Sequence, residues 1–600
     1  MIRFFICGVG LLVLAYGCVA ERDVDGSGGV GGATQSSGAS GVTTGGTTAG
    51  LFILRGKVVG PDGTFDGEVL VDGALIGCVA QGDACSKANP DAGLLVTNGV
   101  IAPGLIDTHN HILFDIFDND DWSPTLPTTC STATDCAASS YCKSGACACT
   151  PFGCKYTDHD RWPKEAEYGL MLDYKQCLED ASQGKPLWCP LSLDGTTNSK
   201  KCEMNKWGSM KGLVAGTTSI VGLPGQSSAC FYGLARSIDV EQNGLEHDRV
   251  QTSAIFPPAK TSADGVCNNV ASGDTEAYLI HVGEGVNQTA LGEFDKLYNL
   301  TSTPGCLFGS ATAITHGTAF GPPEFEKMAA AGMKLIWSPA SNVSLYGATT
   351  DIPAARAAGV TVALAPDWSM GGSQNLLDEL RFARDWSEKH WSGVLSDEEL
   401  VTMVTKNAAS ALGLGDVMGR LEPGFLADLV VFGGDAADPY GTIVDATPAT
   451  VRLVLVGGAA LYGDPEFAAL ASKGPACDST ALCGATKFLC VADDSGHPKA
   501  EQTLTEVKEA LESALSMLDG IDELPVASCG GSCPKGQACF ERTVNPFADA
   551  SKCPAPCAAG EACFQVAQSG STPYKCLPKN ACAPVKARTL APLTPLVRCN

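Results

Sequence analysis

Short apolar runs alternate with helical segments between residues 101 and 415, and this alternation predicts repeated βα units. The apolar runs lie in GLIDTHNH, TTSIVG, VQTSAIF, AYLIHVGE, ATAITHG, KLIWSPAS and TVALAPDW, and stretches such as PPEFEKMAAAGM and IPAARAAG separate some of them. Strands that alternate with helices favour a parallel sheet. Several runs end in polar residues, as strands do at the active-site rim of a (β/α)8 barrel. We therefore predict an α/β fold with a TIM-type barrel over residues 101–415.

Segments with a two-residue period flank this region on both sides. The first, VLVDGALIG, carries an Asp-Gly turn between residues that favour strands. The second consists of ADLVVF and VRLVLVGGAALYG, with a turn predicted at Gly457 and Gly458. We expect residues 51–100 and 416–470 to pair into one β-sandwich beside the barrel.

Cysteine-rich segments interrupt the barrel and follow it. Residues 118–206 include CSTATDCAASSYCKSGACAC, which predicts a disulfide-linked insertion over the barrel mouth. A linker and a helix are expected within residues 471–528, and the helix is predicted to begin with Thr503 and Glu506 as a capping box. In residues 529–600, CGGSCPKGQACF recurs as CPAPCAAGEACF, which indicates a repeated disulfide module.

The chain begins with the features of an export signal. Residues 1–17 hold a positive charge, an apolar run and a small residue, which is the pattern of a signal peptide. LAYGC, which ends at Cys18, resembles the lipobox of bacterial lipoproteins, and the Gly/Ser/Thr tract in residues 18–50 is typical of a flexible tether. We expect a cell-envelope lipoprotein, at the outer membrane or the cell surface, anchored through lipid on Cys18. An ordinary signal with a chance cysteine, and hence a secreted protein, is the alternative.

Charge and cysteine count narrow the choice of partner and compartment. The 66 acidic and 40 basic residues give a net charge of −26, which argues against nucleic acid as a partner. Of the 28 cysteines, Cys7 lies in the signal and Cys18 is the candidate for lipidation, so an even number remains for disulfides in an oxidising compartment. The sequence has no C-x-x-C pair, so a structural zinc site of the usual spacing is not expected.

Two histidines one residue apart, His109 and His111, follow the apolar run of GLIDTHNH. On a strand, residues i and i+2 point to the same side, so both imidazoles are expected to face the barrel mouth and to reach one cation. For this motif alone, two polar residues at a strand end with only a structural role are the alternative.

Three later strand ends carry further side chains of the ligand type. LIHVGEG contains His281 and Glu284, AITHG contains His316, and ALAPDWS contains Asp367. One histidine at such a position is readily explained by packing, but several in one barrel predict a metal site. Neutral or anionic ligands that leave one coordination position open allow a divalent metal to activate water.

The barrel region contains, in order, the motifs PGLIDTHNH, HVGE, THG, WSPASNVSLYG, GVTVALAPDWS and NAASALGL with GRLEPGFLADLVVF. This ordered set resembles the amidohydrolase superfamily, and within it the branch of the triazine hydrolases and the adenosine and guanine deaminases. The likeness runs from about residue 51 to residue 465. It implies a (β/α)8 barrel flanked by a β-sandwich that both ends of the catalytic region build.

The resemblance also implies roles for the polar residues. His109 and His111 would be metal ligands after the first barrel strand, and His281 would be a ligand after the fifth. Asp367 would be a ligand after the eighth strand and would accept a proton from the attacking water. Glu284 would deliver a proton to the leaving nitrogen.

The expected cofactor is one divalent metal, zinc or iron. His316 would lie beside the water that attacks the substrate, or would bind a second metal. Lys260 stands near the position at which binuclear relatives carry a carboxylated lysine, so a second metal stays open. A surface lysine is the other interpretation.

Contacts to a small-molecule substrate are expected from two groups of residues. Ser341 and Asn342 follow the seventh strand, where they would contact substrate or cap the next helix. Trp122, Trp162 and Trp368 would form a flat apolar wall for a heterocycle, or would pack the insertion onto the barrel. The insertion falls where relatives place substrate contacts, so the identity of the substrate is not carried over.

These features predict a metal-dependent enzyme that hydrolyses C–N bonds other than peptide bonds. The expected reaction is hydrolytic deamination of a cyclic, heterocyclic or amidine-like substrate. One alternative is a prolidase-like or amide hydrolase with a binuclear site. Another is a surface binding lipoprotein whose barrel is only a scaffold.

Overall fold

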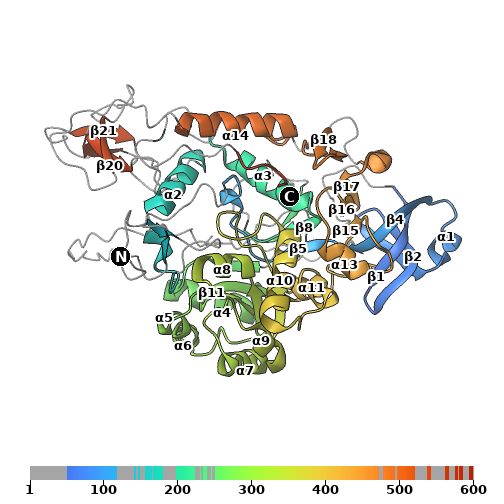
Figure 1. Ribbon diagram of the computed structural model, residues 1–600, viewed down its shortest axis with the longest axis horizontal. Helices are drawn as coiled ribbons and strands as arrows, with labels where there is room; N and C mark the ends of the chain where they lie inside the picture. Colours follow the sequence, from blue (N-terminus) through green and yellow to red (C-terminus); the bar gives the residue numbers. More distant parts are fainter. Residues whose placement is uncertain are drawn as a thin grey trace, which may run out of the picture.

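A computed structural model gives the fold of the chain (Figure 1). It describes residues 50–117, 156–164, 166–179, 198–222, 234–239, 250–471, 477–493, 496–519 and 593–598, together with short strands and isolated positions in the cysteine-rich segments. The expected signal segment, Cys18, the linker as far as residue 49 and Trp122 lie outside the described residues. Within the described part of the chain, no helix combines the length and the apolar character that crossing a bilayer requires.

Parallel strands build the barrel that the alternating pattern predicts. Three of them, in the order β5-β8-β9, form one hydrogen-bonded group, and five form a second group in the order β10-β11-β12-β13-β14. An isolated parallel bridge between Asn110 and Asp367 joins the end of the last strand to the end of the first. The strands are β5 (Leu105–Asp107), β8 (Thr217–Ile220), β9 (Arg236–Ser237), β10 (Val250–Ser253), β11 (Ala277–Val282), β12 (Thr312–His316), β13 (Lys334–Trp337) and β14 (Thr361–Leu364).

Helices connect these strands, and several of them surround β11 in Figure 1. Local sequence explains their ends. Pro322 begins α7 and Gly332 ends it in the left-handed region with φ 70°, while Asp351 caps α9 by accepting a hydrogen bond from Ala354 N. The helices are α3 (Lys201–Leu213), α4 (Lys260–Ser272), α5 (Gln288–Leu291), α6 (Glu293–Asn299), α7 (Pro322–Ala331), α8 (Pro339–Tyr346), α9 (Ile352–Ala358), α10 (Leu376–Trp391), α11 (Asp397–Met403) and α12 (Lys406–Ala411).

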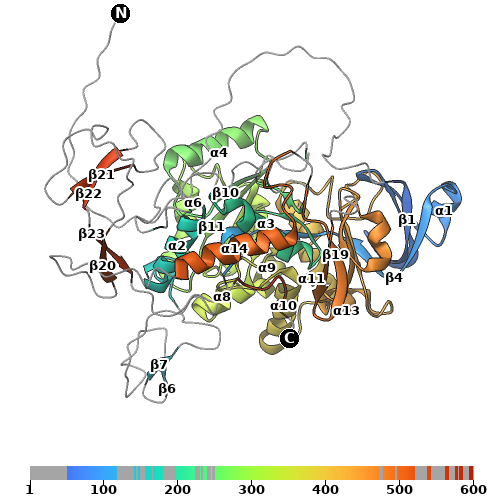
Figure 2. The ribbon, with the colours of Figure 1, turned by 90° about the horizontal axis from the view of Figure 1, so that it is seen from above.

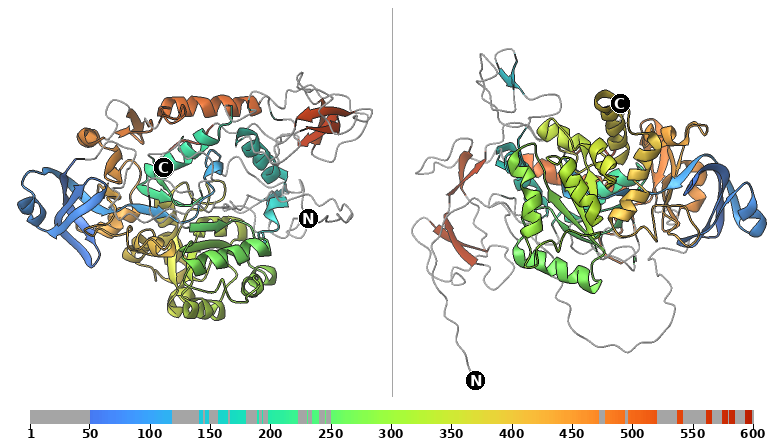
Figure 3. Two further views of the ribbon diagram at one scale, coloured as in Figure 1. Left: turned by 180° about the vertical axis from the view of Figure 1, so that it is seen from behind. Right: turned by 90° about the horizontal axis from the view of Figure 1, so that it is seen from below.

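The two flanking β-elements join into one nine-stranded sheet beside the barrel. This sheet lies at one end of the molecule in Figure 3. The join is the antiparallel pairing of β4 with β15, in which Leu429 lies opposite Pro103 and Phe432 opposite Val100. The predicted Gly-Gly turn links β16 to β17 with positive φ at both glycines. The strands are β1 (Phe52–Gly60), β2 (Gly63–Asp72), β3 (Leu75–Gln81), β4 (Gly93–Pro103), β15 (Leu429–Phe432), β16 (Val451–Val456), β17 (Ala459–Gly463), β18 (Asp478–Leu482) and β19 (Ala485–Leu489).

A long helix near the end of the described chain lies against the barrel helix α3 (Figure 2). This helix, α14 (Leu504–Asp519), begins with the predicted capping box: Thr503 N donates to Glu506 Oε2 at 2.8 Å, and Glu506 N donates to Thr503 Oγ1 at 3.3 Å. Its apolar face is buried at Val507, Ala514 and the leucines spaced along it. The helix therefore belongs to the folded body that carries the barrel.

Disulfides are present in the described part of the chain, as the cysteine content predicts. They include Cys78–Cys85, Cys177–Cys189, Cys202–Cys230, Cys267–Cys306 and Cys477–Cys490. In the C-terminal repeat, each copy contributes a strand at the matching position, β20 (Gln537–Glu541) and β21 (Glu561–Gln565). These strands pair with β23 (Asn580–Pro584) and β22 (Tyr574–Pro578), respectively.

Candidate metal centre

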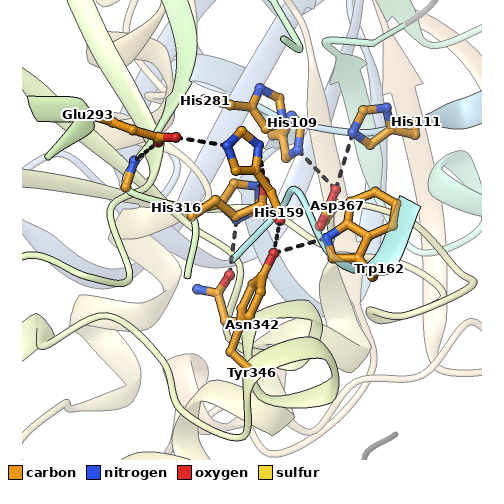
Figure 4. Close-up of polar contacts among 12 residues, drawn as sticks. His109, His111, His159, Trp162, His281, Glu293, His316, Asn342, Tyr346 and Asp367 are labelled. Carbon is orange, nitrogen blue, oxygen red and sulfur yellow. Dashed lines mark hydrogen bonds and ion pairs between the residues drawn. The ribbon is translucent and has the colours of Figure 1, made fainter. Parts of the chain in front are cut away.

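Five polar side chains converge at the carboxyl ends of the barrel strands. His109 and His111 follow β5, His281 lies within β11, His316 ends β12, and Asp367 follows β14 (Figure 4). Because parallel strands end at the same rim of a barrel, residues that lie far apart in sequence meet there.

Two overlapping groups of these side chains have the geometry of a metal site, and they share His109. In the first, His109, His281 and His316 each offer one nitrogen, and these atoms all lie within 4.8 Å of one another. The second, with the same spacing, consists of His109, His111 and Asp367. His111 retains 25% of its side-chain exposure while its neighbours are buried, so the cluster opens to solvent beside His111.

Hydrogen bonds behind the histidines orient two of the rings. His281 Nδ1 lies 3.1 Å from the carbonyl oxygen of Ser253, and His316 Nδ1 lies 3.0 Å from Asn342 Oδ1. A carbonyl oxygen only accepts, so in both rings the proton is assigned to Nδ1. Nε2 of each ring then keeps its lone pair for a cation, and this is the arrangement that metal-ligating histidines usually have.

His109 and Asp367 are close enough to share a cation but are poorly placed to bond to each other. His109 Nε2 lies 2.9 Å from Asp367 Oδ1, yet this buried nitrogen makes no hydrogen bond of acceptable geometry. Burial lowers the pKa of His109 to about 4, so the ring is neutral near pH 7. Burial opposes ionisation of Asp367, but the neighbouring His109 holds the pKa of this carboxyl below its ordinary value. Neutral imidazoles and an anionic carboxylate are the forms that bind metals.

Two of the clustered residues have an unusual backbone conformation. His316 has φ 73° and Asp367 has φ 70°, in the left-handed region that residues other than glycine rarely adopt. Such strain persists only where the surroundings fix it, and it concentrates at functional sites. For Asp367 those surroundings include the closing seam of the barrel, where His111 N donates to Asp367 O at 2.7 Å and Asp367 N donates to His109 O at 3.1 Å.

Glu284 lies beside this cluster and is buried. Its Oε1 accepts a hydrogen bond from the hydroxyl of Tyr346 at 2.6 Å. Its Oε2 lies 3.9 Å from His316 Nε2 and 3.9 Å from His159 Nδ1. Burial and the charge of Glu284 raise the pKa of Tyr346 well above its ordinary value, so this hydroxyl keeps its proton. One carboxylate oxygen of Glu284 is therefore occupied by Tyr346, and the other faces the histidines.

The structure places Asn342, a candidate for contact with substrate, against His316. Its side chain is fully buried, Oδ1 accepts from His316, and Nδ2 lies 3.3 Å from Thr349 Oγ1. Ser341 is also fully buried within α8, and neither residue caps that helix, because Ser338 stands at the N-cap position. Asn342 therefore orients His316 from behind.

Lys260 and the tryptophans occupy different surroundings. Lys260 is exposed at the first turn of α4, and this position agrees with its interpretation as a surface lysine. Trp368 is buried, with its ring 6.1 Å from that of His111 and 5.3 Å from that of Trp162. Trp162 also packs against Tyr168 at 4.9 Å, so these aromatic rings join the insertion to the rim beside the cluster.

Two residues near Glu284 have no counterpart in the sequence predictions. His159 belongs to the insertion, and its loop context gave no indication of a role. Tyr346 ends α8, four residues after Asn342. Residues four apart share one face of a helix, so this spacing was a signal that Tyr346 points to the same side as Asn342.

Known proteins resemble the chain over the region that builds this centre. A family model described as the amidohydrolase family matches residues 216–461. A 5-methylthioadenosine/S-adenosylhomocysteine deaminase of Haloquadratum walsbyi is 29% identical over 210 residues, which are 33% of this chain and 46% of that relative. A 5'-deoxyadenosine deaminase of Methanothermobacter thermautotrophicus is 22% identical over 451 residues, which are 70% of this chain and 95% of that relative.

A solved structure supports the same fold. The crystal structure of an adenosine deaminase from Xanthomonas campestris with bound zinc matches 79% of this chain and 99% of its own, with a TM-score of 0.50 and 14% sequence identity. At this identity the likeness concerns the fold alone. The chain spans about half the length, or less, of most of the methylthioadenosine deaminases that it matches.

Proposed function

We propose that this chain, whose residues 216–461 match the amidohydrolase family model, is a metal-dependent hydrolase that removes an amino group from a nitrogen heterocycle. The observation that carries the proposal is the convergence of two ligand groups on His109, with Glu284 beside them. The names of the relatives support 6-aminopurine nucleosides as the first substrates to test.

The residues present fit a divalent metal. His109 Nε2 is buried without a hydrogen bond of its own, and the Nδ1 atoms of His281 and His316 are tied to acceptors behind the rings. We propose His109, His111, His281 and Asp367 as the ligands of one zinc or iron ion. A bound divalent metal of this kind acts as a Lewis acid and lowers the pKa of a coordinated water to about 7.

The carboxylates divide the proton transfers between them. Asp367 is ionised and lies at the seam of the cluster, so Oδ1 accepts the proton of the attacking water. Glu284 Oε2 faces His316 and, when protonated, gives its proton to the leaving nitrogen; the proton that Asp367 has taken from water then replaces it. Tyr346 holds the other oxygen, Oε1, and so fixes the plane of this carboxylate.

Two alternatives have less support. In the binuclear amide hydrolase, a carboxylated lysine would lie in the site, and the exposed position of Lys260 argues against its taking part. A binding protein with an inactive barrel has no packing reason to retain buried histidines and a carboxylate at one point. Burying such polar groups costs free energy unless partners compensate.

We also propose that the protein works outside the cytoplasm, held at the cell envelope through lipid on Cys18. The disulfides of the described chain support an oxidising compartment. Labelling of the protein with a radioactive fatty acid, lost in a Cys18→Ser variant, is the expected result. If the protein is exported but carries no fatty-acid label, it is secreted without a lipid anchor.

The test of the enzymatic proposal combines metal analysis with ammonia release. We expect about one zinc or iron per mature chain. We also expect ammonia from at least one compound in a panel of 6-aminopurine nucleosides and other aminated heterocycles. Metal-loaded protein that releases no ammonia from any of them would contradict deamination, and protein that takes up no divalent metal would contradict the site itself.

A further inference from the structure

The insertion reaches the rim of the barrel through backbone contacts close to Glu284. Asp158 forms an antiparallel bridge with Gly285, His159 N donates to Glu284 O at 3.2 Å, and Val286 N donates to Thr157 O at 2.8 Å. The insertion segment therefore pairs with the loop that follows β11, the strand that carries the proposed ligand His281.

The sequence of that loop makes this close approach possible. Gly285 has φ 147°, and a Cβ atom at this position would lie 2.6 Å from the carbonyl oxygen of Thr157. Real Cβ atoms do not approach backbone oxygen so closely, so only glycine fits here. Asn287 Nδ2 adds a hydrogen bond to Asp158 Oδ2 at 2.6 Å. The insertion is thus seated in one register on this loop.

This seating brings His159 between two glutamates. His159 Nε2 lies 2.8 Å from Glu293 Oε1 on α6, and Nδ1 lies 3.9 Å from Glu284 Oε2. Glu293 is itself fixed, because its Oε2 accepts from Gly283 N at 2.8 Å. Burial opposes protonation of His159, but the bond to Glu293 and the charges of Glu284 and the neighbouring Asp160 raise its pKa to about 9. A cationic ring therefore faces the free oxygen of Glu284.

A second side chain of the insertion, Trp162, is linked to the other oxygen of Glu284 through the hydroxyl of Tyr346. Trp162 Nε1 donates to the hydroxyl of Tyr346 at 3.0 Å, and that hydroxyl donates to Glu284 Oε1 at 2.6 Å. Figure 4 shows the Trp162 nitrogen directed at the Tyr346 hydroxyl and the His159 ring directed at Glu293. The donor from Trp162 occupies the hydroxyl oxygen, so the hydroxyl hydrogen remains directed at Glu284.

We propose that His159 and Trp162 are positioning residues through which the insertion holds the two oxygens of Glu284 in place. This inference deepens the proposed function and rests on it, since the placement of Glu284 affects catalysis only where this residue transfers a proton. The cysteine-rich insertion then forms part of the catalytic unit, although it interrupts the barrel.

The experiment uses the mature, metal-loaded protein with His159→Gln and Trp162→Phe. Matched controls are His390→Gln and Trp386→Phe on α10, whose rings stack on each other 3.9 Å apart. We expect kcat to fall about 10-fold to 100-fold in each test variant, with KM and metal content close to those of the wild type. Trp162→Phe removes the N–H donor together with part of the ring that packs on Tyr168 and Trp368, so it gives a second test of the proposal if His159→Gln folds poorly.

A double-mutant cycle separates positioning from general packing. If Trp162 acts through Tyr346, the effect of Trp162→Phe disappears in a Tyr346→Phe background. Additive losses of kcat in the double variant would overturn this route, and so would wild-type kcat in both single variants.

Crystal structures give a readout that does not depend on turnover. In zinc-loaded His159→Gln or Trp162→Phe protein we expect the carboxylate of Glu284 to rotate or shift by about 1 Å, a displacement that matters for catalysis. If the wild type releases no ammonia, the proposed deamination fails, while the position of this carboxylate still decides the inference. An unmoved Glu284 in both variants overturns it.

Discussion

Arg236 and Asp428 form a buried, two-pronged ion pair that joins the barrel to the flanking sheet. Arg236 Nε lies 2.7 Å from Asp428 Oδ2, and Nη2 lies 3.0 Å from Oδ1. Arg236 belongs to the barrel strand β9, whereas Asp428 immediately precedes β15 of the sheet. Asp428 Oδ1 also accepts from Gly457 N at 2.6 Å, in the hairpin turn between β16 and β17.

Loss of this pair is expected to destabilise the whole protein. Arg236→Ala leaves the carboxylate of Asp428 buried without its charged partner, which costs about 3–5 kcal/mol of unfolding free energy. Urea denaturation of the mature protein measures the change. The exposed pair of Lys389 and Asp385 gives the control, because Lys389→Ala is expected to change stability by less than about 1 kcal/mol. Equal effects would contradict a structural role for the buried pair.

Asp367→Asn is expected to abolish activity and to reduce metal content. The amide cannot accept a proton and is a weaker ligand than the carboxylate, so kcat is expected to fall at least about 1000-fold. Elemental analysis and ammonia release measure the two effects. Asp385→Asn, on the exposed face of α10, is the matched control. Full metal content with full activity in Asp367→Asn would remove this residue from the site.

Asn342→Ala is expected to lower activity without a direct contact to substrate. The variant removes the acceptor that holds Nδ1 of His316 at 3.0 Å, and loss of such a partner behind a metal-site histidine costs about 10-fold to 100-fold in affinity or activity. Competition with a chelator and steady-state kinetics measure the two quantities. The exposed Asn299 supplies the control variant Asn299→Ala. A change in KM alone would instead support a contact between Asn342 and substrate.

The pH dependence of stability is expected to carry a contribution from His159. Its pKa rises from about 6.5 in the unfolded chain to about 9 in the folded one, mainly because Glu293 and Glu284 stabilise the cation against the cost of burial. The stabilisation is therefore full below pH 6.5 and is lost as pH rises through 9, with a total of up to about 3 kcal/mol. Denaturation of wild type and His159→Gln at a series of pH values tests this. If the unfolding free energies of the two proteins change with pH in the same way, His159 makes no such contribution.

The bond between Cys267 and Cys306 is expected to stabilise the fold under oxidising conditions. It links α4 to the segment before β12 across 39 residues, and closing a loop of this length contributes about 4 kcal/mol in the chain-entropy description. Replacing both cysteines by serine should lower the denaturation midpoint, and a thiol reductant should then have a smaller effect on the variant than on the wild type. An unchanged midpoint in the double variant would contradict this contribution.

The barrel and its ligand candidates could be predicted because their signals are local. An apolar run followed by histidine or aspartate is visible in a few residues, and the topology of a parallel barrel brings such strand ends together. The pairing of β4 with β15 also follows from local strand patterns combined with the family resemblance.

The surroundings of Glu284 could not be predicted in this way. His159 reaches the site because the insertion pairs with the loop at Gly285, and this register depends on contacts between segments more than 100 residues apart. The role of Asn342 depends on which face of α8 turns toward β12. The same residue types in the sequence fit a helix cap, a substrate contact or an orienting partner, and only the packing distinguishes them.

The bridge between Asn110 and Asp367 determines the order in which the parts of the site come together during folding. The first proposed ligands, His109 and His111, emerge from synthesis early, but Asp367 follows more than 250 residues later and joins them only when the last barrel strand pairs with the first. A chain that ends before this strand holds the histidines without the carboxylate, so it lacks the complete ligand set. Metal retention therefore reports whether the barrel has closed, and the same ion that serves the reaction would stabilise the finished fold over every partly folded form.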